Sequence, residues 1–267
     1  PSAASATADL NGKAVQIACE QILHRLKNAA AALFHTVPER ISIKDNMVWL
    51  DGKPTEMEWN KLVLEAYLKR VNLSEHGHYA TPEIFFDNTK EKGHPFAYHV
   101  FGTAITTVTV DCLRGTYEID AVDLVHDFGT TMNPLIDRGQ IEGGLVQGIG
   151  WMTMEEIVFD DEGRLRSNAL STYKVPDIYS APKQINIKFL ETKEDNLAIF
   201  RSKAVGEPPL MYGIGAFFAL RNAIKSFNPA AKPAFDAPMT AEKVLMNLYP
   251  EKVAAMEAKL QPAAIEK

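Results

Sequence analysis

One carboxylate in the sequence stands in a setting that suits a general base. Glu207 follows Gly206 and precedes Pro208 and Pro209, and its wider surroundings over 202–211 are Ser-Lys-Ala-Val-Gly-Glu-Pro-Pro-Leu-Met. Burial among apolar residues disfavours the ionised form of a carboxyl group and raises its affinity for protons, which suits a base that works near neutral pH. Because most glutamates lie on protein surfaces, an exposed turn glutamate is the alternative.

Two further segments carry groups that suit ligand binding. The residues from Ser2 to Thr7 read Ser-Ala-Ala-Ser-Ala-Thr and precede a predicted helix, and helix N-termini favour anions such as phosphate. Gln140 precedes a glycine-rich stretch, and its amide both donates and accepts hydrogen bonds, as recognition of a heterocycle requires. A frayed terminus and a locally satisfied polar side chain are the alternatives for these segments.

Hydrophobic spacing and turn signals predict the elements that position these groups. Helices are expected over about 12–34 with Asp9 as the cap, from a capping box of Thr55 and Glu58 through Tyr67, over 141–157, through 214–224, and after the cap Thr240. Strands are expected over 41–44, 47–50, 97–111, 117–127 and 185–191, with 97–127 forming a long hairpin. Hairpins and helices in separate blocks favour an α+β fold.

The expected helix over 141–157 contains four glycines. Gly143, Gly144, Gly148 and Gly150 each cost about 1 kcal/mol relative to alanine inside a helix. We therefore predict that another segment approaches this helix closely.

Composition excludes several classes of protein. The 267 residues carry a net charge of −6, with 46% hydrophobic and 23% charged residues, which is typical of a globular protein and lacks the basic surface that nucleic acids require. No apolar run is long enough to span a bilayer. Cys19 and Cys112 stand far apart, so neither a disulfide framework nor an iron–sulfur site is expected, and a reducing cytoplasm fits best.

The sequence begins at Pro1 without a signal peptide, so we expect the chain to be a piece whose true start lies elsewhere. Within it, 40–80 is expected to form a surface subdomain, and 240–267 a C-terminal helix with a mobile tail beyond Pro262.

Several segments together resemble the molybdenum-cofactor domain of the xanthine dehydrogenase and aldehyde oxidase family. They occur in the family's order from Pro1 to about Ser226, and are Ala3-Ala-Ser5, Gly93-His-Pro-Phe96, Asn133-Pro-Leu-Ile-Asp137, Gly139-Gln-Ile-Glu-Gly143, Val146-Gln-Gly148, Ser171-Thr-Tyr-Lys174 and Ser202 to Leu210. The resemblance implies that residues 1–267 are the C-terminal half of a molybdopterin-binding domain.

The resemblance also implies roles for single residues. Glu207 matches the catalytic glutamate, which takes a proton from the molybdenum-bound hydroxide as that oxygen attacks an electron-poor carbon. The backbone amide of Ala4 matches the one that lies at the molybdenum, and Ala3 and Ala4 border the substrate. Positions that hold the pterin and its phosphate correspond to Ser5, Thr7, Gln140 and Gly206. Ala8 departs from the family, where a hydroxyl residue is frequent.

Partners and substrate follow from the same resemblance. It implies Mo-molybdopterin in this domain, the preceding half of the domain, and [2Fe–2S], FAD and NAD on partner domains or subunits of a complex that dimerises. Ala-Val-Gly-Glu-Pro-Pro-Leu and Ala3-Ala4 look most like the purine-oxidising branch, which acts on hypoxanthine and xanthine. The alternatives are an aldehyde or an N-heterocycle such as nicotinate as the substrate, and a noncatalytic assembly module without a cofactor.

Overall fold

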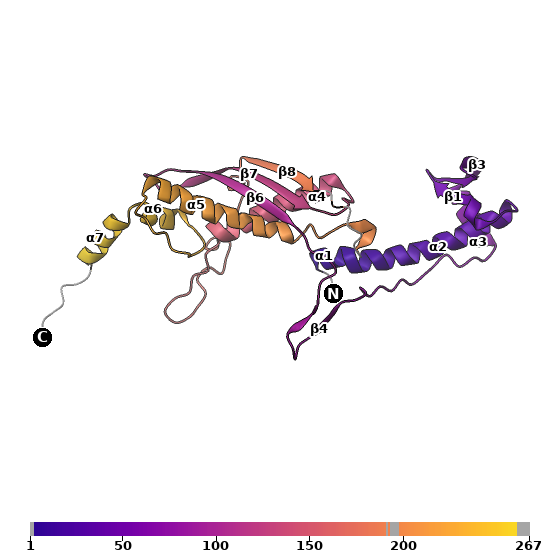
Figure 1. Cartoon of the computed structure of the whole chain (residues 1–267), viewed down its shortest axis with the longest axis horizontal. Helices are drawn as coiled ribbons and strands as arrows, with labels where there is room; N and C mark the ends of the chain where they lie inside the picture. The colour runs from indigo at the N-terminus through magenta and orange to yellow at the C-terminus, as the bar shows by residue number, and fades with distance from the viewer. Residues whose placement is uncertain (1–2, 191, 193–197, 261–267) are drawn as a thin grey trace. The chain divides into compact units, whose positions relative to one another are not determined.

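The computed structural model describes residues 3–190, 192 and 198–260. The chain divides into two compact units, one made of Pro1–Ala97 with Leu197–Ile199 and the other of Tyr98–Asn196 with Phe200–Lys267. Figure 1 shows the course of the chain through both units. Within the described ranges, no helix combines the length and the apolar character needed to cross a membrane.

The first unit is built on one long helix that follows a short π-helical stretch. Its elements are α1 (Ala4–Ala6), the π-helix η1 (Thr7–Asn11), α2 (Gly12–Leu33), the 3-10 helix η2 (Pro38–Arg40), β1 (Ile41–Lys44), β2 (Met47–Leu50), β3 (Lys53–Glu58), α3 (Trp59–Leu68), β4 (Phe85–Asp87) and β5 (Lys92–His94). The predicted helix over 12–34 and the strands over 41–44 and 47–50 are confirmed.

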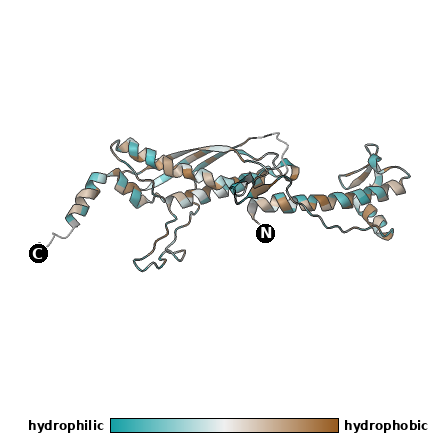
Figure 2. Ribbon diagram, turned by 60° about the horizontal axis from the view of Figure 1, so that its bottom comes forward, coloured by the Kyte–Doolittle hydropathy of each residue, from teal (hydrophilic) through white to brown (hydrophobic). Residues whose placement is uncertain are grey.

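A hydrophobic core joins the C-terminal half of α2 to α3 and to the antiparallel sheet β1-β2-β3. Its buried members are Leu26, Ala29, Ala30, Ala31, Ile41, Val48, Leu62 and Ala66. Figure 2 shows hydrophobic and hydrophilic bands alternating along α2, as expected for a helix with one buried side.

The chain returns from α3 in an extended segment that runs beside α2 (Figure 1). The Arg25 guanidinium donates at 3.0 Å to each of the carbonyls of Asn72 and Ser74, and it pairs with the Glu75 carboxylate. A Cβ on Gly77 would lie 2.0 Å from the Ala14 carbonyl oxygen, so this segment needs a glycine where it crosses α2.

Two predicted helix starts are wrong in this unit. Asp9 caps no helix, because the chain is already helical from Ala4 and Asp9 lies inside η1. Thr55 lies in β3, where its hydroxyl donates to the Val48 carbonyl at 2.7 Å, so the expected capping box does not form. Strand pairing therefore overrides the local capping signal, and α3 begins only at Trp59.

The second unit is a three-stranded sheet with helices on one face. Its elements are β6 (Gly102–Val110), β7 (Tyr117–Asp127), α4 (Pro134–Thr153), β8 (Gln184–Leu190), the 3-10 helix η4 (Pro208–Gly213), α5 (Ile214–Phe227), α6 (Ala241–Leu248) and α7 (Pro250–Leu260), while the 3-10 turn η3 (Ile199–Arg201) lies where the two units divide. Side chains of β7, α4 and α5 share its central core. The predicted strand over 117–127 and the Thr240 cap are confirmed, and the strand predicted over 185–191 is confirmed as far as Leu190, while Glu191 lies outside the described residues.

The sheet mixes antiparallel and parallel pairing. Strand β7 pairs antiparallel with β6 and parallel with β8, and α4 lies in the connection between β7 and β8. The predicted α+β class is confirmed. The sequence pattern of hairpins and helices in separate blocks did not predict the single β-α-β connection from β7 through α4 to β8. The tail beyond Pro262 lies outside the described residues.

Two boundaries differ from the sequence expectation. Strand β6 begins at Gly102, five residues after the expected start at Ala97. Helix α4 begins at Pro134 and ends at Thr153, so it starts seven residues before the predicted Ile141. The Asn133 side chain caps it by accepting from two backbone amides, and Pro134 occupies its first turn, a combination that favours helix starts.

The close approach predicted from the glycines of α4 is confirmed, and the approaching segment is η4. A Cβ on Gly148 would lie 2.0 Å from the Leu210 carbonyl oxygen, and one on Gly144 would lie 3.0 Å from Cβ of Pro209. From the other side, a Cβ on Gly213 would lie 2.2 Å from the Gly148 carbonyl carbon. Backbone therefore packs on backbone where η4 crosses α4.

We predict opposite effects of two glycine substitutions in α4. Gly148→Ala should lower the free energy of unfolding of the assembled protein by roughly 1–3 kcal/mol, because a methyl group there overpacks the contact with η4. At Gly143 an added Cβ would meet no described atom outside its own helix turn within 4 Å, so Gly143→Ala should raise the free energy of unfolding by up to about 1 kcal/mol through helix propensity. Urea unfolding of both variants checks this, and equal effects would contradict the packing explanation.

Candidate functional site

Glu207 lies at a bend between an extended segment and η4, and its side chain is exposed. Within the described residues, its carboxylate forms no hydrogen bond or ion pair. The apolar flanks seen in the sequence therefore do not bury this carboxylate within the chain itself. Val205 instead packs against the central core, and Pro209 is buried against α4.

The segment before Glu207 continues the sheet at the end of β7. The Lys203 amide donates to the Phe128 carbonyl at 2.7 Å, and the Thr130 amide donates to the Arg201 carbonyl at 2.8 Å. Gly129 between them has φ +61°, and a Cβ there would lie 2.3 Å from the Arg201 carbonyl oxygen. Glycine is thus required where this segment meets the end of the strand.

A buried ion pair fixes the same segment through its side chain. Nζ of Lys203 lies 2.7 Å from Oδ2 of Asp127, and both side chains are 0% exposed. The other oxygen, Oδ1, accepts from the Gly129 amide at 2.9 Å and from the Thr192 hydroxyl at 2.7 Å. Burial acts to raise the pKa of Asp127, but these hydrogen bonds outweigh it and hold the pKa below its ordinary value. The carboxylate is therefore ionised at neutral pH.

His126 forms a second link, between the two sides of Glu207. Its Nε2 lies 3.4 Å from the Ala204 carbonyl oxygen, and its Nδ1 lies 2.6 Å from the hydroxyl of Tyr212 in η4. Because a carbonyl can only accept, Nε2 carries the proton and Nδ1 accepts from Tyr212. Burial lowers the pKa of His126 below its ordinary value, so the ring is neutral at pH 7. Burial and the Asp127 charge raise the pKa of Tyr212 to about 12.

Tyr212 reaches His126 by passing over β6 at Gly102. A Cβ on Gly102 would lie 1.8 Å from the Tyr212 hydroxyl oxygen. Edge contacts between His126 and the rings of Tyr212 and Phe128 complete this packing. Strand β6 therefore starts with a residue that leaves room for the link.

Two further site residues predicted from the sequence, Gly206 and Gln140, lie in this unit. Gly206 directly precedes Glu207, and Gln140 lies near the start of α4 with its side chain exposed. The structure thus brings Gly206 and Glu207 to the helix that carries Gln140, because η4 packs on α4 at Gly144 and Gly148.

The other predicted site residues lie together at the start of the first unit. Ala3 precedes α1, and Ala4 and Ser5 begin it. The Thr7 hydroxyl and amide both donate to the Ala3 carbonyl, at 2.6 and 2.8 Å. The Ser5 hydroxyl is buried and has no hydrogen-bond partner among the residues that the structure describes. A buried hydroxyl without a partner is costly in a folded protein, so a ligand that bonds to it would remove that cost.

Sequence reasoning did not single out the four side chains that hold the segment before and after Glu207. These side chains are His126, Asp127, Lys203 and Tyr212. The sequence did carry a signal for Asp127, at the end of an apolar strand, and for Lys203, inside an apolar segment. Charged residues in such places are rarely buried unless they are paired, so the two could have been candidates for a buried ion pair. Partners that stand 76 residues apart, such as Asp127 and Lys203, cannot be matched from one sequence.

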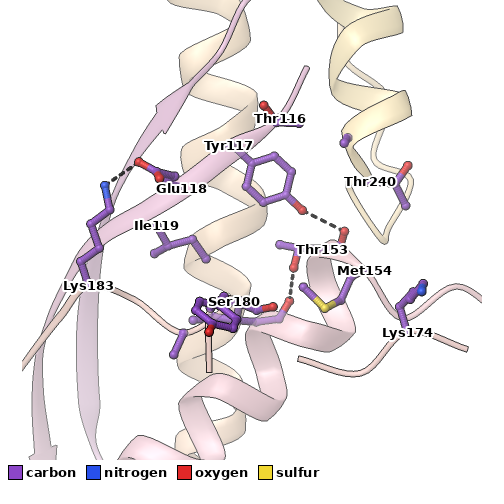
Figure 3. A pocket seen from close by; sticks show the side chains of 14 residues that line it. Thr116, Tyr117, Glu118, Ile119, Thr153, Met154, Lys174, Ser180, Lys183 and Thr240 are labelled. Carbon is purple, nitrogen blue, oxygen red and sulfur yellow. Dashed lines mark hydrogen bonds and ion pairs between the residues drawn. The ribbon is translucent and has the colours of Figure 1, made fainter. Parts of the chain in front are cut away.

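A cavity of about 400 Å³ lies at the start of β7 (Figure 3), whereas His126 lies near the end of that strand. Its walls come from the start of β7, the end of α4, the loop before β8 and the start of α6. The Tyr117 hydroxyl donates to the Thr153 carbonyl at 3.0 Å, and Lys183 pairs with Glu118. No site residue predicted from the sequence lines this cavity.

Comparison with known proteins gives a consistent set of similarities. Residues 1–182 match the family model of the molybdopterin cofactor-binding domain. The chain is 39% identical over 250 residues to xanthine dehydrogenase/oxidase of Rattus norvegicus and 36% identical over 258 residues to xanthine dehydrogenase of Oryza sativa subsp. japonica. These alignments cover 91% and 92% of the chain, which spans only 17% of the length of either relative.

Among solved structures, quinoline 2-oxidoreductase from Pseudomonas putida 86 has a similar fold. The TM-score is 0.74 at 24% sequence identity, and the match covers 92% of this chain and 30% of that one.

We predict that the His126 side chain makes stability pH-dependent. The unfolded chain binds a proton at this histidine near pH 6.5, whereas the folded chain resists protonation, so the folded state loses stability as pH falls below about 6.5. His126→Gln, which hydrogen-bonds but does not titrate, should flatten this slope in urea unfolding of the assembled protein between pH 7.5 and 5.5. His24→Gln, at an exposed position, should keep the slope, and a His126→Gln slope equal to wild type would refute the assignment.

Proposed function

This chain belongs to the molybdopterin cofactor-binding domain family of the molybdenum hydroxylases, and we propose that it forms the C-terminal half of such a domain in a xanthine dehydrogenase. The proposed reaction is oxidative hydroxylation of hypoxanthine and xanthine to urate. Water supplies each oxygen atom, and two electrons and two protons leave with every hydroxylation.

One observation carries this proposal most directly. Glu207 combines an exposed carboxylate with a backbone that is held on both sides, by the end of β7 before it and by α4 after it. A general base must present its accepting oxygen to the reacting proton at a fixed position, and this arrangement suits that requirement. The identity to xanthine dehydrogenases over nine tenths of the chain supports the choice of reaction.

The cofactor proposed for this domain is Mo-molybdopterin, and the residues present fit it. The buried Ser5 hydroxyl without a partner is suited to an acceptor or donor of the cofactor, as is the exposed amide of Gln140. We assign Thr7 and Gly206 to the same group, and the Ala4 backbone amide to the molybdenum. When bound, the cofactor supplies oxygen transfer and the acceptance of two electrons.

The chain's own residues supply proton transfer and space. The Glu207 carboxylate accepts the proton that leaves the attacking oxygen as this oxygen bonds to the ring carbon of the purine. Alanine at positions 3 and 4 is a residue type small enough to suit a site for a planar ring. A base of this kind contributes about 10²- to 10⁴-fold to a rate.

The proposed reaction needs partners that lie outside this chain. We propose that the preceding half of the domain covers the exposed face around Glu207, and that domains or subunits with [2Fe–2S] centres and FAD pass the electrons to NAD. The assembled complex is proposed to be a cytoplasmic dimer, with residues 40–80 as a surface subdomain and 240–267 as a C-terminal helix and tail.

The Glu207 assignment predicts a large loss of turnover from a small change. Glu207→Gln in the assembled enzyme should lower kcat with xanthine by about 10²- to 10⁴-fold, because the amide accepts no proton at neutral pH. Molybdenum content should stay normal. Glu162→Gln, in the exposed turn before Gly163, is the matched control and should keep full activity.

Other outcomes of the same experiment discriminate the alternatives. An undiminished rate in Glu207→Gln would refute its role as the base. Oxidation of an aldehyde or of nicotinate without xanthine turnover would select a different substrate in the same family. An intact complex that lacks molybdenum would support a noncatalytic assembly module.

The Ser5 assignment predicts weaker retention of the cofactor. Ser5→Ala should lose about tenfold in affinity for the cofactor, the equivalent of one hydrogen bond, measured as molybdenum per protein after dialysis. Ser42→Ala, on the exposed side of β1, should lose none. If Ser5→Ala kept its molybdenum and became more stable, the hydroxyl would have no ligand and the assignment would fail.

A further inference from the structure

We infer that the buried ion pair of Lys203 and Asp127 positions the Glu207 carboxylate, so that both are positioning residues for proton transfer. This inference rests on the function proposed above, because it concerns the geometry of the same base. Neither side chain is exposed, so neither can contact the substrate, and both act through the segment that they hold.

The anchor before Glu207 fixes the backbone four residues upstream. Lys203 is held at two points, its amide on the Phe128 carbonyl and its Nζ on Asp127, both at 2.7 Å. Asp127 is in turn fixed by the Gly129 amide and the Thr192 hydroxyl on its other oxygen. Next to Lys203, the Ala204 carbonyl faces Nε2 of His126.

After Glu207, the backbone is held by two prolines and by the packing of η4 on α4. Pro208 and Pro209 restrict φ directly after the glutamate, and η4 lies against the glycines of α4. The Tyr212 hydroxyl contacts Nδ1 of the same histidine that faces Ala204. Both ends of the segment 203–212 are therefore held by contacts with residues at the end of β7.

Between these anchors, the position of the carboxylate depends on the backbone. No hydrogen bond or ion pair to Glu207 is found in the described part of the chain, so no side-chain contact there corrects a displaced loop. A shift of the Lys203 anchor is transmitted through three residues to the glutamate. Small displacements of a catalytic group have large effects on rate, because proton transfer needs hydrogen-bond reach.

Stability alone does not account for a charged pair in this place. The cost of desolvating two charges offsets much of their attraction, and apolar residues of similar volume give comparable stability. An ion pair in which every hydrogen-bonding atom of the carboxylate has a partner instead fixes the distance and direction between the Lys203 and Asp127 side chains. Every oxygen of Asp127 has a partner, which is the arrangement that defines the Lys203 position most strictly.

The test uses the assembled holoenzyme and a variant that removes both charges together. Lys203→Met alone would leave a buried unpaired carboxylate and can prevent folding, so Asp127→Asn/Lys203→Met is the main variant. We expect its kcat per bound molybdenum to fall at least tenfold while KM for xanthine changes less than threefold. Thr192→Val, which removes only one bond to Asp127, should lower kcat by a few fold at unchanged KM.

A matched control removes an ion pair elsewhere in the same unit. Glu118→Gln/Lys183→Met deletes the exposed pair between β7 and the loop before β8, together with the contact of Lys183 with Asp120 at 3.2 Å, and it should leave kcat and KM unchanged. In holoenzyme without substrate, amide hydrogen exchange of residues 202–213 should accelerate at least tenfold in Asp127→Asn/Lys203→Met and stay unchanged in this control.

A double-mutant cycle with Glu207→Gln separates positioning from general damage. If the pair acts through Glu207, Asp127→Asn/Lys203→Met should cost less than twofold in the Glu207→Gln background. An equal loss in both backgrounds, or unchanged kcat and exchange in the wild-type background, would overturn the inference and leave the function proposed for Glu207 intact. An active Glu207→Gln enzyme would instead overturn that function, and the inference with it.

Discussion

The contact of backbone with backbone around residues 201–213 is the constraint on which this site depends. This segment lies directly on the end of β7 and on α4, and each crossing leaves no room for a side chain, as Gly129, Gly148 and Gly213 show. Such contacts fix the path of the main chain more narrowly than side-chain packing does, because no rotamer can relax them. The glycines that weaken α4 as an isolated helix therefore make the position of Glu207 possible.

Buried polar side chains hold the same segment through hydrogen bonds. At the end of β7, Asp127 binds Lys203 before Glu207, while His126 contacts the same segment both before and after Glu207, at Ala204 and Tyr212. One is kept neutral by burial, while the other is kept ionised by its hydrogen bonds. The chain thus supplies position for the glutamate and leaves its carboxylate exposed. We propose that other parts of the assembled protein remove water from this site, which would strengthen the electrostatic interactions there.

Much of this fold could be predicted where local pattern and tertiary structure agree. Strand β7 and helix α2 match their predicted ranges because period and turn signals coincide, and the glycines of α4 correctly predicted a close neighbour. The capping box predicted at Thr55 is wrong because the Thr55 hydroxyl donates a hydrogen bond to a neighbouring strand, a contact that local sequence does not reveal. The segment 202–211 drew attention to Glu207, but Asp127, Lys203 and Tyr212 were missed because distant pairing is fixed only by the fold. The apolar neighbours of Glu207 suggested burial, with exposure as the alternative; Val205 and Pro209 turn inward, whereas the carboxylate is exposed.

The most direct test of the central claim joins metal content to chemistry in one sample. Molybdenum in the native complex that contains this chain is measured by elemental analysis while xanthine-dependent reduction is followed in the same preparation. A molybdenum hydroxylase that acts on purines should contain the metal and be reduced by xanthine. An intact complex without molybdenum would contradict this account, and one that contains molybdenum but is not reduced by xanthine would contradict the purine substrate.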